Sequence, residues 1–188
     1  MKQVLKGCTH AIFTAASDGS RQAAIEVDYR GMIKAYRACI EVGVQRLVIC
    51  SSVLVDPVNG WNWIRIMLNF LCTRGILDCK HRGETEVRKI SETCDTSYTI
   101  VRPGALFDGD IGESGGLISG QTNASFASRA TRADISRILI EAITSDKVKN
   151  TTFECGSDKT AQPQSDLSTI FDGVEMKLTY FDVNFITM

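Results

Sequence analysis

The sequence predicts an α/β domain in which a parallel sheet is covered by helices on both faces. Runs of strand length recur at residues 9–16, 44–50 and 98–101, and segments of helical length with one apolar stripe separate them. The second run is too continuously apolar for a half-exposed strand, which favours a sheet buried on both sides. A chain of 188 residues is long enough for one domain with a substantial core.

The first strand is expected over residues 9–16, and it ends at the turn-forming residues 17–20. Ser20 is a candidate N-cap for a long helix, and Gly43 stands where a left-handed residue ends a helix. Between them, small and apolar residues recur at three- and four-residue steps and predict one buried stripe: Ala24, Val27, Gly31, Ala35, Ala38 and Val42. Residues 44–50 then form the second strand.

A short apolar helix or loop is expected over residues 57–75, followed by a more polar helix over residues 77–91. We place Lys80 on the buried face of that helix as its single charge, so Lys80 needs a partner there. The alternative is a lysine at the start of the helix whose amine extends to water. The face as a whole comprises Lys80, Gly83, Val87, Ile90 and Cys94.

The third strand, over residues 98–101, runs into Pro103-Gly104. In an open α/β sheet, ligands bind in the crevice beyond the carboxyl ends of the strands. A strand that ends in Pro-Gly would present its backbone to such a ligand. This stretch, with Lys80 and the pair Ser51-Ser52 that follows the second strand, is the part of the sequence that points most directly to a binding site.

The last third of the chain begins with an irregular region over residues 108–130, with short strands expected near 117–119 and 125–127. Thr131 to Asp134 resembles a capping box. The helix that it opens carries one apolar stripe: Ile135, Ile138, Leu139, Ala142 and Ile143. A late strand and a terminal helical turn are expected at 151–155 and 167–171. We assign residues 1–175 to one domain and residues 176–188 to a C-terminal tail or extra strand.

The composition excludes several classes of function. The net charge of −1 with scattered Lys and Arg gives no footprint for nucleic acid or anionic lipid, and no apolar stretch is long enough to span a membrane. Seven cysteines without C-x-x-C spacing indicate reduced thiols used as small hydrophobic groups, and two histidines make a metal site improbable. We expect an intracellular protein, cytoplasmic by default, with an organellar location left open.

Five motifs in order resemble the atypical short-chain dehydrogenase/reductase family, the NmrA-like NAD(P)-binding Rossmann group. They are Val27-Asp28-Tyr29-Arg30-Gly31, Gly43 to Ser52, the K-x-x-G-E sequence Lys80 to Glu84, Tyr98 to Gly104, and Thr131 to Ile135. Thr152-Phe153-Glu154 is similar to the family's late strand. The resemblance runs from about His10 to Gly156, and it implies a dinucleotide cofactor, NAD or NADP, and a small-molecule substrate if the chain is active.

The resemblance also implies roles for single residues. Ala15, Ala16 and Ser17 would lie beside the adenosine half of the dinucleotide. Ser51 and Ser52 would lie near the nicotinamide ribose, where a hydroxyl can orient a substrate carbonyl. Lys80 would hydrogen-bond to the ribose hydroxyls. The backbone of Pro103, Gly104 and Ala105 would contact the carboxamide. Ser52 and Lys80 would be the catalytic candidates. For both serines, a polar strand end bonded to water is the alternative.

Two departures from the family pattern bear on activity. The position four residues before Lys80, where catalytic members of the wider superfamily have a proton-donating tyrosine, is Ile76. The chain also has no G-x-x-G-x-x-G loop, which in the family precedes the strand at residues 9–16 and holds the pyrophosphate. We therefore expect an incomplete, truncated Rossmann-like fold that binds NAD(P) weakly or not at all, and whose first strand is an exposed edge open to self-association.

Three functions stay open from the sequence. The first is an NAD(P)-binding oxidoreductase-like domain, weak or inactive as this chain stands. The second is a non-catalytic scaffold or redox-sensing interaction protein derived from that fold. The third is an unrelated α/β hydrolase or transferase that uses Ser51 or Ser52. The sequence counts against it, because it has no G-x-S-x-G elbow and no suitably placed histidine.

Overall fold

The computed structural model describes residues 1–57, 63–67, 69, 75–121 and 128–174. Its centre is a five-stranded sheet with the strand order β1-β2-β3-β7-β5. The first four strands in this order are parallel, and β5 is antiparallel to β7. Their bounds are β1 His10–Phe13, β2 Arg46–Cys50, β3 Ser97–Pro103, β7 Thr151–Asp158 and β5 Gly116–Gln121. The predicted parallel sheet is confirmed, and the three predicted core strands are its first three.

A long helical segment connects β1 to β2. It consists of α2 (Arg21–Ala23), a π-helical part η1 (Ala24–Gly31) and α3 (Met32–Val42). The predicted caps are confirmed: Ser20 Oγ accepts from the Ala23 N–H at 3.1 Å, and Gly43 adopts a φ of 77°. The predicted stripe is partly wrong, because Val27 and Val42 are only half-buried. The residues of this segment with no exposed surface are instead Ala24, Asp28, Met32 and Tyr36, at four-residue steps, and Cys39 three residues later.

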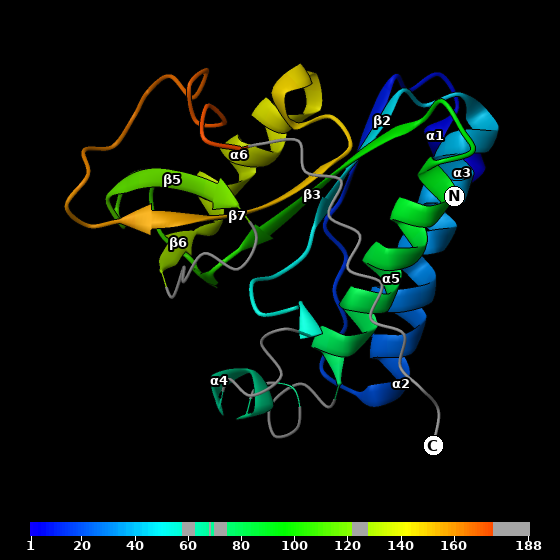
Figure 1. Cartoon of the computed structure of the whole chain (residues 1–188), viewed down its shortest axis with the longest axis horizontal. Helices are drawn as coiled ribbons and strands as arrows, with labels where there is room; N and C mark the ends of the chain where they lie inside the picture. The colour runs from blue at the N-terminus through cyan, green and yellow to red at the C-terminus, as the bar shows by residue number, and fades with distance from the viewer. Residues whose placement is uncertain (58–62, 68, 70–74, 122–127, 175–188) are drawn as a thin grey trace.

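The predicted polar helix is confirmed as α5 (Ile76–Ser91), and it lies beside η1 and α3 on one face of the sheet, as Figure 1 shows. The short helix α1 (Lys2–Leu5) packs against the end of α3. The core of this layer combines the two long helices with β2 and β3: Met32, Ala35, Tyr36, Cys39, Val44, Leu47, Ile49, Val87, Tyr98 and Ile100. Burial of these apolar side chains stabilises the layer, each by about 1.5–3 kcal/mol when fully enclosed.

The opposite face of the sheet is covered by α6 (Arg132–Thr144). Thr131 caps this helix, since its Oγ1 accepts from the Asp134 N–H at 3.0 Å, as the capping box predicts. The expected apolar stripe is buried at Ile135, Ile138, Leu139 and Ala142 and half-buried at Ile143. The 3-10 turn η4 (Asp146–Val148) leads into β7. The sheet is therefore covered on both faces, in agreement with the sequence prediction.

A second, two-stranded parallel sheet follows the end of β3. It pairs β4 (Ala105–Phe107) with β6 (Arg129–Thr131). The strand predicted near 117–119 is confirmed as part of β5. The predicted helical turn at 167–171 is wrong in kind, because this segment forms successive turns, although it buries Leu167 and Phe171 in the core. The strand predicted near 125–127 and the tail at 176–188 lie outside the described residues, as does most of 57–75, where α4 (Trp63–Ile66) is described.

Candidate functional site

The carboxyl ends of the first three strands meet at one edge of the sheet, which we call the strand-end edge. The register pairs Phe13 of β1 with Ile49 of β2, and Cys50 of β2 with Val101 of β3. Three predicted segments therefore begin at this edge: Ala15–Ser17 after β1, Ser51-Ser52 after β2, and Gly104-Ala105 after β3. The sheet thus brings together residues that are almost 90 positions apart in the sequence.

Lys80 has a buried partner, as the sequence analysis requires. Its Nζ lies 2.8 Å from Asp28 Oδ1, and the two side chains are 7% and 0% exposed. The second carboxylate oxygen of Asp28 accepts a hydrogen bond from the Ser17 N–H at 3.1 Å. The alternative of a lysine that extends its amine to water is therefore wrong. Asp28 was missed by the sequence prediction, because the expected stripe placed its neighbour Val27 inward instead.

Ser51 is buried and bound to a second carboxylate. Its hydroxyl donates to Glu84 Oε1 at 2.5 Å, and Arg102 donates to both oxygens of Glu84, at 3.3 and 2.6 Å. Glu84 and Arg102 are 0% and 2% exposed. The prediction that Lys80 is the single charge on the buried face of this helix is therefore wrong. Its i+4 neighbour Glu84 is equally buried, and the pairing with Arg102 and the hydrogen bond from Ser51 make that burial tolerable.

Electrostatics keep Glu84 ionised. Burial by itself raises the pKa of this carboxyl, but Arg102, Arg88 and the hydrogen bonds from Arg102 and Ser51 outweigh it and lower the pKa to about 2. Arg88 Nη1 also donates to Thr152 Oγ1 of β7 at 3.1 Å. The Glu84 cluster, which consists of Ser51, Glu84, Arg88 and Arg102, thus connects α5 with β2, β3 and β7.

The remaining predicted site residues differ in how exposed they are and in whether their polar groups are already hydrogen-bonded. Ser52 is half-buried, and its side chain forms no hydrogen bond with another described residue. Ala15, Ala16 and Ala105 are exposed. Pro103 and Gly104 are buried, and the Gly104 N–H donates to Cys155 O at 2.9 Å. β3 therefore continues through Pro103, and this N–H is used within the sheet.

No described tyrosine replaces the missing proton donor by an evident contact. Ile76 is the first residue of α5 and is 9% exposed, so an aliphatic group occupies the position. The hydroxyl of Tyr36 donates to Thr96 O, before the amino end of β3, and Tyr98 is buried in the core between β3 and the helices. The ring of Tyr29 lies under the Arg82 guanidinium, 4.8 Å from its carbon.

A dinucleotide fits this edge in part. Small exposed residues at Ala15 and Ala16 leave the backbone accessible, and the hydroxyl of Ser52, which bonds to no other described residue, suits a ribose or carbonyl oxygen. The buried Ser17 Oγ also lacks a hydrogen-bond partner beside the Asp28–Lys80 pair. The Lys80 ammonium is paired with Asp28 but has three N–H donors, whereas the hydroxyl proton of Ser51 and the Gly104 N–H are already used inside the protein. The edge therefore offers fewer free donors than the sequence suggests.

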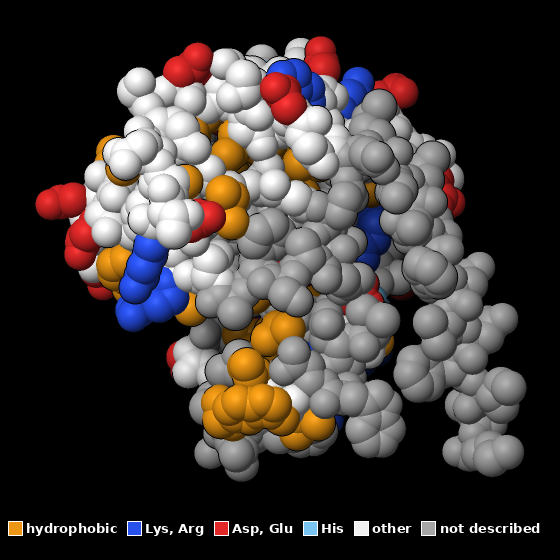
Figure 2. All heavy atoms as spheres, turned by 60° about the vertical axis from the view of Figure 1, so that its left-hand side comes forward, with side chains coloured by type: hydrophobic (Ala, Val, Ile, Leu, Met, Phe, Trp, Pro, Cys, Tyr) orange, Lys and Arg blue, Asp and Glu red, His pale blue; other side chains and the backbone are white. Residues whose placement is uncertain are grey.

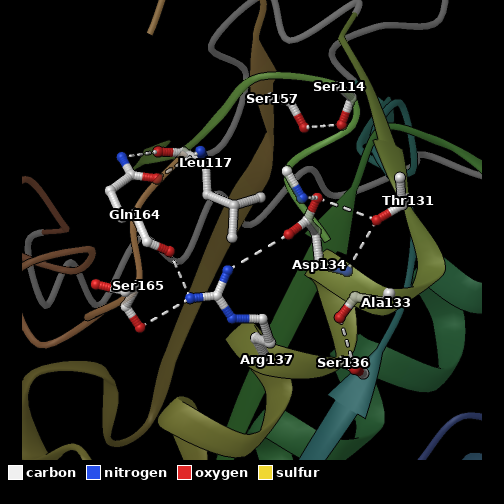
Figure 3. A network of polar contacts seen from close by, with 11 residues as sticks. Ser114, Leu117, Thr131, Ala133, Asp134, Ser136, Arg137, Ser157, Gln164 and Ser165 are labelled. Atoms are coloured by element: carbon white, nitrogen blue, oxygen red, sulfur yellow. Dashed lines mark hydrogen bonds and ion pairs between the residues drawn. The ribbon is translucent and has the colours of Figure 1, made fainter. Parts of the chain in front are cut away.

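A second polar network, drawn in Figure 3, fixes the region that follows β3. Asp134 is fully buried and accepts from the Gly112 N–H at 2.9 Å and from Thr131 Oγ1 at 3.0 Å. Arg137, one turn further along α6, donates to the carbonyls of Gln164 and Ser165. This network holds the loop before β5 and the segment after β7 against the start of α6.

Other features of the described residues lie away from the strand-end edge. One shallow cavity, lined by His10, Gln45, Arg46 and Ser97 among others, lies at the amino ends of β1, β2 and β3. Among the described residues, no cluster of His, Cys, Asp or Glu is suited to a metal ion, and no helix has the length and hydropathy to cross a membrane. Figure 2 shows an exposed hydrophobic group where Figure 1 has α4, whose Trp63 is 70% exposed.

The fold and the strand-end edge define a Rossmann-like protein of the nucleotide-binding type. The sequence matches the model of a family described as NAD(P)H-binding over residues 1–146, so the chain belongs to this NAD(P)H-binding family. This confirms the resemblance at the level of the family and the fold. The matched region includes the strand-end segments and the buried carboxylates Asp28 and Glu84.

Two curated relatives and several solved structures are similar to the chain. A stretch of 103 residues is 32% identical to the uncharacterized sugar epimerase YhfK of Bacillus subtilis, over 54% of this chain and 42% of that protein. The UPF0659 protein YMR090W of Saccharomyces cerevisiae is 24% identical over 144 residues, 74% of this chain and 58% of that protein. The chain therefore spans about half the length of these relatives.

The solved structures support the fold. A putative NAD-dependent epimerase/dehydratase from Bacillus halodurans has a TM-score of 0.67 at 23% identity, covering 86% of this chain and 69% of that chain. The oxidoreductase ylbE from Lactococcus lactis has a TM-score of 0.69 at 22% identity, covering 86% and 67%. A short-chain dehydrogenase/reductase from Veillonella parvula, solved in complex with NADP, has a TM-score of 0.62 at 13% identity, covering 88% and 70%.

Proposed function

We propose that the chain is an NAD(P)(H)-binding domain of an atypical short-chain dehydrogenase/reductase. The dinucleotide would lie along the strand-end edge, with its adenosine half beside Ala15–Ser17 and its nicotinamide half beside Ser51-Ser52 and Gly104-Ala105. One observation carries the proposal. The segments Ala15–Ser17, Ser51-Ser52 and Gly104-Ala105 begin at the same edge of a parallel sheet, and Lys80 lies beside the first of them through Asp28. Crevices at this edge are where open α/β sheets bind ligands.

Within this proposal, the two serines have different roles. Ser51 donates its proton to Glu84, so it holds the strand end in place and can only accept hydrogen bonds at the edge. Ser52 keeps its hydroxyl free of other described residues and can donate to a substrate carbonyl. We therefore assign contact with substrate or cofactor to Ser52 and to the Lys80 amine. Hydride transfer is the chemistry that a nicotinamide dinucleotide supplies when it is bound.

Affinity is expected to be weak for the 188-residue polypeptide. It has no G-x-x-G-x-x-G loop, and each charge-assisted backbone hydrogen bond to a pyrophosphate contributes about 1.5–3 kcal/mol. Several missing bonds correspond to orders of magnitude in Kd. Calorimetry with NADPH and NADH tests this directly: binding that saturates with a Kd above about 50 µM supports the proposal. The absence of any binding at millimolar dinucleotide would contradict it.

A non-catalytic scaffold is the second candidate, and one observation favours it. The tyrosine position holds Ile76, so the usual proton donor is missing at this position. Redox sensing is less favoured, because sensor thiols need a low pKa. Burial raises the pKa of Cys39 to about 11 and also raises the pKa of Cys50 and Cys155. We therefore place the oxidoreductase-type domain first and the scaffold second.

Self-association is the partner that the sheet itself suggests. β1 pairs with β2 on one side and lies at the end of the five-stranded sheet among the described strands. Its Ile12 side chain is 38% exposed. A strand edge with free backbone groups and an exposed apolar side chain favours pairing with a second copy, so we propose a weak dimer through β1.

A further inference from the structure

Asp28 is a fully buried carboxylate that two different parts of the strand-end edge contact. Its Oδ2 accepts from the Ser17 N–H at 3.1 Å, and its Oδ1 lies 2.8 Å from Lys80 Nζ. A carboxylate with no exposed surface is tolerated only where it is paired and hydrogen-bonded. We propose that Asp28 is a positioning residue that anchors Lys80 and the segment Ala15–Ser17 to each other. The importance of this anchor for a dinucleotide rests on the proposed function.

The π-helical part of the first long helix places Asp28 for this role. Ala24, Asp28, Met32 and Tyr36 are each 0% exposed, and they are separated by steps of four residues. Residues four positions apart lie on the same face of a helix. Ala24 and Asp28 belong to the π-helical part η1, and Met32 and Tyr36 continue the same step in α3. This step turns the Asp28 carboxylate inward, toward Lys80 of α5 and the Ser17 N–H.

Gly83 allows Lys80 to reach this carboxylate. A Cβ atom at Gly83 would lie 2.8 Å from Asp28 O and 3.0 Å from Met32 Sδ, so a side chain there would push α5 away from η1. Lys80 precedes Gly83 by one helical turn and lies on the same face of α5. The K-x-x-G spacing therefore supplies both the amine and the close approach that the ion pair needs.

The anchor has a specific consequence for the edge. Lys80 belongs to the helix between β2 and β3, whereas Ser17 belongs to the loop after β1. Through Asp28, a displacement of either one is transmitted to the other, because both contacts use the same carboxylate. The reactivity of the Lys80 amine therefore reports the ion pair, and the exchange rate of the Ser17 amide proton reports the hydrogen bond, so both contacts can be measured in the same variant.

Selective acylation of lysines in the cofactor-free chain provides the test. The wild type and D28N are treated with acetic anhydride, and mass spectrometry gives the acetylation rate of Lys80 relative to exposed Lys89 on the same helix. In D28N the buried ammonium loses its counter-charge, so it either extends to solvent or loses its proton. Both responses raise the relative rate, and we expect a rise of at least about tenfold.

E26Q is the matched control, since Glu26 lies on the same π-helical part but pairs with the exposed Arg30. Its relative rate should equal that of the wild type. A ratio in folded D28N within about twofold of the wild type, or an equal rise in E26Q, would overturn the proposal. If D28N does not fold, the double variant D28N/K80M, in which both side chains are neutral, is used instead. Its readout is the exchange rate of the Ser17 amide proton. Faster exchange supports the anchor, and an unchanged rate contradicts it.

A titration with NADPH separates this inference from the proposed function. If the wild type fails to bind NADPH, the proposed function fails, and the acetylation ratio still decides whether Asp28 holds Lys80. If the wild type binds, the Kd of folded D28N, which keeps Lys80, should be at least about tenfold higher than that of the wild type. An unchanged Kd in that variant would overturn a positioning role for the cofactor.

Discussion

The hydroxyl of Ser51 and the carboxylate of Glu84 are joined by a 2.5 Å hydrogen bond that links the end of β2 to the middle of α5. The same carboxylate binds Arg102 through two hydrogen bonds, so one buried group ties two strand ends to one helix. This cluster contacts the strand-end edge, as does the ion pair between Asp28 and Lys80, the latter one turn before Glu84 on α5.

Neutralising Glu84 should destabilise the protein severely. E84Q removes the closest counter-ion of the buried Arg102 and leaves Asp56 at 4.0 Å, and breaking a buried pair in this way costs about 3–5 kcal/mol. The free energy of unfolding, measured by urea denaturation, should fall by that amount. E86Q, on the same helix but half-buried, serves as the control and should change it by less than about 0.5 kcal/mol. Equal effects of the two substitutions would refute the importance of the cluster.

Stability should depend on acid through Glu84. The pKa of this carboxyl falls from 4.5 to about 2 on folding, so the folded state binds its proton less readily than the unfolded state. Above about pH 4.5, ionised Glu84 therefore contributes about 3 kcal/mol to the free energy of unfolding. This contribution is lost as the pH falls toward 2. The difference in unfolding free energy between the wild type and E84Q should therefore shrink below pH 4.5. A constant difference down to pH 3 would contradict the lowered pKa.

Gly83 should not tolerate a side chain. G83A places a methyl group 2.8 Å from Asp28 O, and overpacking of this kind costs about 1–3 kcal/mol, more than the helix propensity of alanine returns. Thermal unfolding should show a lower Tm. G173A is the control, since a Cβ there would meet no atom within 4 Å. A Tm of G83A at or above that of the wild type would show that the two helices can separate freely.

The sequence contained much of this architecture but not its polar interior. Strands and helices followed from apolar runs and from the caps at Ser20, Gly43 and Thr131, which are local signals. Asp28 was missed because the stripe of small and apolar residues placed its neighbour Val27 inward, while Val27 is only half-buried. Glu84 was missed because a charged side chain is assigned to solvent unless its partner is known, and Arg102 is 18 positions away in sequence.

The convergence of the three strand ends could be predicted for a related reason. In a parallel sheet the carboxyl ends of consecutive strands share an edge, so Ser51, Ser52 and Gly104 could be grouped from the strand pattern alone. Which of these groups are free cannot be read from one sequence. The hydrogen bonds that engage Ser51 and Gly104 come from α5 and β7, and they depend on the packing of the whole domain.

Alanine substitutions of the two neighbouring serines should have different effects on stability and on cofactor binding. S51A removes a buried hydrogen bond to a charged group and should lower the free energy of unfolding by about 1.5–3 kcal/mol. S52A should leave stability within about 0.5 kcal/mol of the wild type but raise the Kd for NADPH several-fold. Denaturation and calorimetry on both variants check this. If S52A destabilises as much as S51A without affecting Kd, the assignment is reversed.

The β1 edge should mediate self-association. I12K introduces a charge on the exposed side chain of the edge strand, and lysine on an edge strand opposes pairing with a second copy. Sedimentation equilibrium should show weak dimerisation of the wild type that I12K abolishes. I111K, also at an exposed isoleucine but in the loop before β5, should dimerise like the wild type. A strictly monomeric wild type at high concentration would contradict this prediction.

Titration of the ¹⁵N-labelled chain with NADPH, followed by NMR, tests the central claim most directly. The account predicts shifts that saturate in the high micromolar range or above and are concentrated at Ala15–Ser17, Ser51-Ser52 and Gly104-Ala105. Shifts concentrated instead around His10, Gln45 and Ser97, at the opposite ends of the strands, or the absence of any shift at millimolar NADPH would contradict it.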